Sequence, residues 1–107
     1  MRLQPGQCAI CRKAEQGAGY YLGRGKAIWF CNEDVGMGDQ YRAAQRHGLI
    51  AAIERKALLA AGDKAGQWLD DLGKTDLATL DAVEWQGFLE TFMESYGHAM
   101  RAELGAR

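Results

Sequence analysis

Three cysteines near the start of this 107-residue chain have the spacing of ligands for a metal ion. Cys8 and Cys11 form a C-x2-C pair, and Cys31 follows after a gap of 19 residues. A two-residue gap lets a tight turn aim two thiolates at one point, as structural zinc sites require. The longer gap suits a β-hairpin that carries the chain out and back. The pattern therefore predicts Zn2+ held by a small finger.

The sequence offers more than one candidate for the fourth ligand. Asp34 completes a Cys31-x2-Asp34 pair, and aspartate is an accepted though rarer ligand of structural zinc. His47 offers an imidazole, which is the better donor, but the chain must then fold back to reach the site. Glu33, water or a residue of a partner are further candidates. We take Asp34 as the expected fourth ligand beside the three cysteines.

Two other interpretations of the cysteines remain open. They could be small buried apolar side chains, a role in which cysteine is common. Alternatively, the site could have lost its fourth ligand. An iron–sulfur cluster is a weaker match, because such clusters prefer four cysteines.

The finger must be built from the short segments around these ligands. Residues 20–22 and 27–30 are rich in aromatic and β-branched side chains, which predicts two strands. The sequence between them, Gly23-Arg24-Gly25-Lys26, predicts a hairpin turn.

The rest of the chain is expected to be helical. Asp39 can cap a short helix that runs to about residue 47, and apolar residues at intervals of three and four predict a helix over 50–72. Gly62 and Gly66 fall inside it, and could permit a bend or a close approach of another helix. Gly73 ends it.

The spacing of a capping box, with Asp81 at the cap and Glu84 three residues later, predicts the start of the last helix. Its apolar residues recur at helical spacing. They are Trp85, Phe88, Leu89, Phe92, Met93, Tyr96 and Met100. These residues span too wide an arc for one facing helix, so the finger or a second chain should cover part of them. Packing between the two long helices is expected through Trp68, Trp85, Phe88 and Phe92.

The predicted fold class is therefore α+β. A zinc-binding hairpin module over residues 1–38, resembling a treble clef or zinc ribbon, packs on a helical region over residues 39–107. We expect each part to have a core of its own.

Composition is that of a soluble globular protein, with 48% hydrophobic and 25% charged residues. No apolar run approaches a membrane span, and the first residues lack the apolar core of a signal peptide. A cytoplasmic location, where thiols stay reduced and bind metal, is expected. Residues 1–62 carry nine Lys and Arg against five acids, whereas residues 63–107 carry four against nine. A basic front half suits an anionic partner, although uneven surface charge alone would look the same.

The sequence lacks the residues or the structural context that three kinds of catalytic or nucleotide-binding site would need. A thioredoxin-like use of Cys8 and Cys11 requires a βαβ context that is missing. A finger-based nuclease requires a histidine near the hairpin, and His47 is the first histidine. The Gly-rich segment ending in Lys26 lacks the Ser or Thr of a phosphate-binding loop. We therefore expect a non-enzymatic protein.

The chain resembles a family of short, uncharacterised proteins from phages and prophages of proteobacteria. The resemblance rests on Cys8-x2-Cys11, on Trp29-Phe30-Cys31, and on Leu72-Gly73-Lys74-Thr75-Asp76-Leu77-Ala78 followed by Glu84-Trp85. In the family pattern the position of Asp34 is more usually His or Cys. The resemblance implies a phage setting, inside the bacterial host, and an accessory role in nucleic-acid metabolism or against host defence.

Two functions follow as hypotheses. The first is a protein-interaction module, such as an inhibitor of a host defence complex or a homodimer, using the apolar last helix. The second is a nucleic-acid-binding finger, in which basic residues meet phosphates and Trp29 or Tyr21 stacks on bases. The basic residues are Arg12, Lys13, Arg24 and Lys26.

Overall fold

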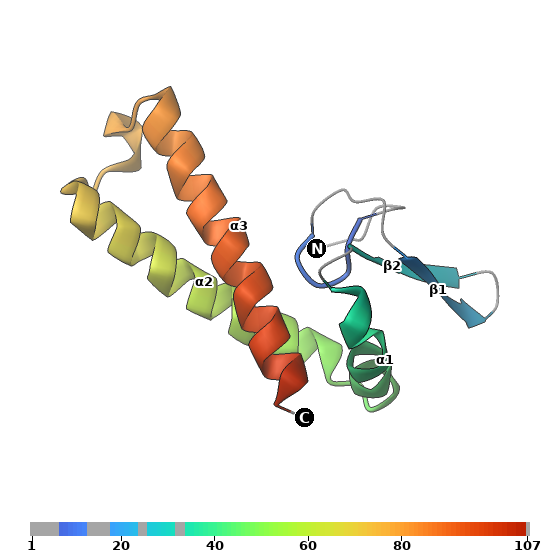
Figure 1. The fold of residues 1–107 in the computed structure, drawn as a ribbon. Coiled ribbons are helices and arrows are strands. Elements are labelled where there is room, and N and C mark those ends of the chain that lie inside the picture. The colour runs from blue at the N-terminus through green and yellow to red at the C-terminus, as the bar shows by residue number, and fades with distance from the viewer. Residues whose placement is uncertain (1–6, 13–17, 24–25, 32–33, 107) are drawn as a thin grey trace.

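The structure is a computed structural model that describes residues 7–12, 18–23, 26–31 and 34–106, without the side chains of residues 18–27 and of Val35. It is mostly helical (Figure 1). The elements are β1 (Ala18–Gly23), β2 (Lys26–Phe30), η1 (Val35–Met37), α1 (Gly38–Arg46), α2 (Ile50–Leu72), η2 (Leu77–Thr79) and α3 (Ala82–Gly105).

Helices α2 and α3 form the predicted helical hairpin, and the signals at its turn act as expected. Gly73 follows α2 with φ 79°, a left-handed conformation that glycine adopts without strain. The side chain of Asp81 accepts a hydrogen bond from the Glu84 N–H, and the Glu84 carboxylate accepts one from the Asp81 N–H. This capping box starts α3. The turn between α2 and α3 lies at the end of the hairpin that is remote from β1, β2 and α1 (Figure 1).

The N-terminal part contains the predicted β-hairpin. Strands β1 and β2 pair antiparallel, with Ala18 opposite Phe30. Residues 7–12 contain the first two cysteines, and we call them the cysteine segment. This segment lies along β2, because Cys8 forms a parallel bridge with Trp29 and the Ala9 N–H donates to the Trp29 carbonyl at 2.8 Å. One local prediction is wrong: Asp39 lies within the first turn of α1, whose cap position is Met37. Met37 makes no side-chain capping bond, so the 3-10 turn of η1 leads directly into the helix.

The core is continuous between the two parts, contrary to the expectation of separate cores. Buried residues of the cysteine segment and of β2 form one cluster with residues of α1, α2 and α3. The α2 side of this cluster is narrow, since Ile53 is joined there by Ala57 and Ala61. Small alanines allow α3 to approach closely and leave room beside it for the N-terminal part. Burial of this shared surface holds the two parts together.

The aromatic packing predicted between the long helices is only partly buried. Trp85 and Phe88, both on α3, stack on each other with ring centroids 5.7 Å apart, and Trp85 is 44% exposed. Across the hairpin, the Trp68 ring of α2 lies against Gly87 of α3. The fully buried side chains of α3 are instead Tyr96, Met100 and Leu104, in its C-terminal half. The sequence predicts that either the finger or a second chain covers the wide apolar arc of α3. The N-terminal part packs against the C-terminal half of α3 and so covers that portion of the arc. No helix among the described residues is long and apolar enough to cross a membrane.

Glycines of α2 and α3 provide a first test of this docking. A Cβ at Gly97 would lie 3.0 Å from the Cys11 Cβ, whereas a Cβ at Gly66 or Gly62 would meet nothing within 4 Å. The cysteine-bearing N-terminal segment therefore approaches α3 closely at Gly97, and α2 approaches α3 closely at Gly87, where a Cβ would lie 2.8 Å from the Trp68 ring. The idea that Gly62 and Gly66 permit a close approach is wrong. We expect Gly66→Ala to be more stable than Gly97→Ala by about 2 kcal/mol, from helix propensity and overpacking together. Urea unfolding of the two variants measures the difference, and equal stabilities would contradict the docking.

Candidate metal centre

The structure brings together the four predicted ligands. The ligand atoms of Cys8, Cys11, Cys31 and Asp34 all lie within 4.8 Å of one another. All four residues are buried, and Asp34 is completely so. The cluster lies between the cysteine segment, the end of β2 and the start of η1. This grouping of three thiols and one carboxylate can hold a metal ion.

Three of the separations among the ligand atoms are close to those expected around a tetrahedral ion. Two sulfurs each 2.3 Å from a central zinc stand roughly 3.8 Å apart, and the shorter zinc–oxygen bond reduces the sulfur–oxygen separation. The Sγ atoms of Cys11 and Cys31 are 3.7 Å apart. The Asp34 Oδ2 lies 3.3 Å from the Cys8 Sγ and 3.1 Å from the Cys31 Sγ. Thiolates with one carboxylate favour Zn2+ over Mg2+ or Ca2+, which prefer oxygen ligands.

Short backbone hydrogen bonds aim each pair of ligands. In the first pair, the Arg12 N–H donates to the Cys8 carbonyl at 3.0 Å, and the Ile10 N–H points at the Cys8 Sγ at 3.4 Å. In the second pair, the Asp34 N–H donates to the Cys31 carbonyl at 3.0 Å. The two-residue gaps of the sequence thus become two tight turns that face each other.

Asp34 is held by a residue from the far end of the chain. The Arg101 Nε donates to its Oδ1 at 2.5 Å, and an Arg101 terminal nitrogen lies 3.3 Å from its Oδ2. Burial by itself raises the pKa of Asp34, but the hydrogen bonds from Arg101, Cys31 and Cys8 together lower it by more, so the pKa lies below its usual value. The carboxylate is therefore ionised, with Oδ2 toward the thiols and Oδ1 toward Arg101.

Arg101 also balances the charge of the centre. Three thiolates and one carboxylate exceed the charge of a divalent cation by two, and the guanidinium offsets half of that excess. Burying such a charge without a partner is costly. Arg101 is therefore placed to orient Asp34 as an outer partner of the ligand set when a metal binds.

The Cys31 thiol keeps its proton in the metal-free site. Burial raises the pKa of Cys31, and its hydrogen bond to Asp34 raises it further. A metal must displace this proton, because only the thiolate is a ligand. Metal affinity is accordingly expected to increase with pH.

The alternative fourth ligands do not join this cluster in the described part of the chain. His47 is exposed at the C-terminal end of α1 and is not part of the metal-binding group. Glu33 lies outside the described residues. The geometry thus favours Asp34 over His47.

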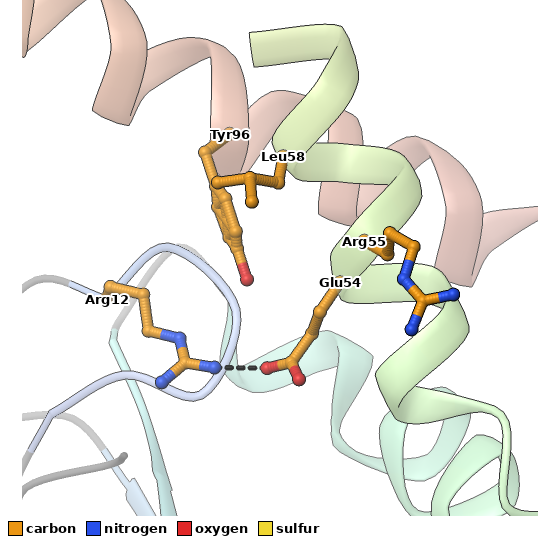
Figure 2. Close-up of a pocket in the computed structure, with 5 residues that line it drawn as sticks. All are labelled: Arg12, Glu54, Arg55, Leu58 and Tyr96. Carbon is orange, nitrogen blue, oxygen red and sulfur yellow. Dashed lines mark hydrogen bonds and ion pairs between the residues drawn. The ribbon is translucent and has the colours of Figure 1, made fainter. Parts of the chain in front are cut away.

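Of the basic residues considered for phosphate contacts, Arg12 is the one whose side chain the structure describes. Arg12 is 6% exposed and pairs with Glu54 of α2 (Figure 2). Lys13 and Arg24 lie outside the described residues, and the side chains of Lys26 and Tyr21 are not described. Arg12 is therefore turned inward, because α2 presents a carboxylate to it.

Arg12 has an unusual backbone conformation. Its φ is 69°, whereas an L-residue with a side chain avoids the left-handed region at a cost of about 1–2 kcal/mol. The Cys8–Cys11 turn imposes this angle, which glycine would adopt freely. An arginine there indicates that its side chain contributes to the structure, through the pair with Glu54.

Two substitutions separate the backbone from the side chain at this position. Arg12→Gly and Arg12→Ala both remove the pair with Glu54, but only glycine relieves the strain. We expect Arg12→Gly to be more stable than Arg12→Ala by about 1 kcal/mol, with both less stable than the parent. Denaturant unfolding of the metal-loaded proteins measures this order, and an alanine variant as stable as the glycine variant would contradict it.

Sequence reasoning missed Arg101, Glu54 and Gly97. Each acts on a residue far away along the chain, so no local spacing marks it. Arg101 could have been suspected only as one of four basic residues in the acidic half.

The fold and site together define a helical hairpin against which an N-terminal part packs, with a buried cluster of three cysteines and one aspartate that could hold a metal ion. The chain belongs to DUF6511, a family of unknown function that matches residues 49–107. This match spans α2 and α3, and so includes Arg101 and Gly97 but none of the four ligands. No curated protein and no solved structure matches the chain.

Proposed function

We propose that the chain is a non-enzymatic, zinc-stabilised protein-interaction module. The observation that carries the proposal is the closed cluster of four buried donors. Four protein ligands complete a tetrahedral zinc ion and leave no position for water or substrate, which is the arrangement of structural sites. In this proposal the metal ties a treble-clef-like or ribbon-like finger to the helical hairpin.

The surface of the hairpin supports an interaction role. Large apolar side chains are exposed around the turn between α2 and α3 and on the first turns of α3. They are Leu72, Leu77, Val83, Trp85 and Leu89. We call this set the hairpin tip. A group of exposed apolar residues in so small a protein supports a contact with another protein.

The resemblance to phage-encoded proteins suggests which class of partner to test. In that setting the module acts in the cytoplasm of the bacterial host, and a host defence complex is the partner to test first. A second copy of the chain is the alternative. The nucleic-acid function has less support, since Arg12 is turned toward Glu54 and no described observation favours it.

The metal part is tested by elemental analysis of the protein purified without added metal. We expect about one zinc per chain, retained against a weak chelator at neutral pH and lost on acidification. Less than half an equivalent after purification would contradict the zinc centre.

The interaction part is tested by photo-crosslinking in the host cell. A benzoylphenylalanine at Val83, which is 81% exposed, probes the hairpin tip, and one at the exposed Ala51 is the matched control. We expect a discrete adduct from Val83 alone. An adduct of twice the chain mass identifies a homodimer, and the absence of any adduct contradicts an interaction through the tip.

A further inference from the structure

A small cavity opens where three distant segments meet, away from the thiol cluster. It has a volume of about 230 Å³. Its lining comes from the cysteine segment, from one turn of α2 and from α3 (Figure 2). The lining residues are Arg12, Glu54, Arg55, Leu58 and Tyr96.

The deep side of the cavity is polar. The guanidinium of Arg12 pairs with the Glu54 carboxylate, and both groups lie near the end of the Tyr96 ring (Figure 2). The Tyr96 hydroxyl points between them. Tyr96 is 1% exposed, and its hydroxyl oxygen has no hydrogen-bond partner of good geometry among the described residues. The Arg12 guanidinium lies close enough to act on the oxygen as a donor, which leaves the hydroxyl hydrogen for an acceptor. Burying a polar group in this state is unfavourable, so the hydroxyl marks the place where a ligand atom can bind.

The mouth of the cavity combines charge with apolar surface. Arg55 is exposed beside it, and Leu58 is 43% exposed. The guanidiniums of Arg12 and Arg55 and the carboxylate of Glu54 give the cavity a net charge of plus one. This charge favours a ligand that carries a single negative charge. The Glu54 carboxylate would repel a second one. Guanidinium groups match the geometry of both carboxylates and phosphates, so the single charge is what favours a carboxylate here.

The volume limits the size of the ligand. Pockets for drug-sized molecules occupy about 300–1,000 Å³, so this cavity suits a smaller group. A short hydrocarbon chain can lie against Leu58 while its charged end reaches the hydroxyl.

We propose that this cavity binds a small monocarboxylate, whose oxygens accept hydrogen bonds from the Tyr96 hydroxyl and an arginine while its hydrocarbon part contacts Leu58. The carboxylate belongs either to a free short-chain acid or to a glutamate side chain of a bound protein. Both sources present the same chemical group. The inference does not rest on zinc or on the hairpin tip.

The protonation of the hydroxyl agrees with a donor role. Burial raises the pKa of Tyr96 above its usual value, and the nearby Arg12 opposes this only in part. The hydroxyl therefore stays protonated at neutral pH and can donate to an anion.

Titration of the purified, metal-loaded protein followed by amide and methyl NMR tests the proposal. The probes are butyrate, the blocked amino acid N-acetylglutamate amide, and inorganic phosphate. We expect saturable shifts at Leu58 and around Tyr96 with a carboxylate probe, and weaker binding of phosphate at pH 7.5. Saturation by both carboxylates supports a free acid, and saturation by the blocked glutamate alone supports a protein side chain.

Variants locate the binding site. Tyr96→Phe removes only the hydroxyl, whose loss should weaken binding at least about tenfold, as expected for a hydrogen bond to a charged group. Arg55→Gln should weaken binding by a smaller factor, and Lys64→Gln, an exposed change elsewhere on α2, should leave it unchanged. Melting temperatures confirm that each variant is folded. Undiminished binding by folded Tyr96→Phe, or no saturable shift in the parent with any carboxylate, would overturn the proposal.

Discussion

Replacing Cys31 by serine should remove the metal from the chain and loosen the base of the helical hairpin together with the N-terminal part. A structural zinc ion in a small finger contributes on the order of 10 kcal/mol to folding, so losing one ligand should lower the unfolding free energy by at least about 3 kcal/mol. The effect should spread because Cys31 belongs to the same buried cluster as Tyr96 and Met100.

Hydrogen exchange can show how far this loosening spreads. We expect lost protection in β2 and in the C-terminal half of α3, with residual protection near the hairpin turn, where Gly87 packs against Trp68. Ile53→Val is a suitable control, since it removes one buried methylene for about 0.5–1.5 kcal/mol and leaves the ligands intact. Full metal content in Cys31→Ser would exclude the proposed ligand set.

Asp34→Ala should be nearly as damaging, for two reasons that add. The change removes a ligand, and it removes the buried carboxylate with which the partly buried Arg101 pairs. Breaking a buried ion pair costs about 3–5 kcal/mol, and Arg101 is 31% exposed, so the lower end of that range is expected. Competition with a chromophoric chelator should show metal affinity lower by more than about a hundredfold.

Companion variants separate the two roles of Asp34. Arg101→Gln keeps the ligand but removes the outer charge, and should lower metal affinity by about 10–100-fold. Asp34→His restores a ligand but places an imidazole beside the guanidinium, so it should recover affinity only in part. His47→Ala is the matched control and should change nothing. A larger loss of metal from His47→Ala than from Asp34→Ala would reverse the assignment.

The local elements of this protein could be predicted from the sequence because their signals are local. The capping box of Asp81 and Glu84 and the glycine at position 73 act on backbone atoms within a few residues. The C-x2-C and C-x2-D pairs depend on tight turns of the same kind. The periodicity of apolar residues over 50–72 predicts a helix for the same reason, since each turn of a helix repeats the same neighbours.

The tertiary structure alone decided how these elements meet. Arg12 pairs with Glu54, and Arg101 with Asp34, across chain separations that no spacing rule covers. The sequence suggested Arg12 as a surface charge, but in the fold Glu54 lies close to it and the two side chains form an ion pair in which Arg12 is buried. The shared core could not be predicted either. The alanines of α2 do not reveal in the sequence that α3 and the cysteine segment pack against them. Backbone signals act over one turn, whereas charge pairing and close packing depend on which surfaces the whole fold brings together.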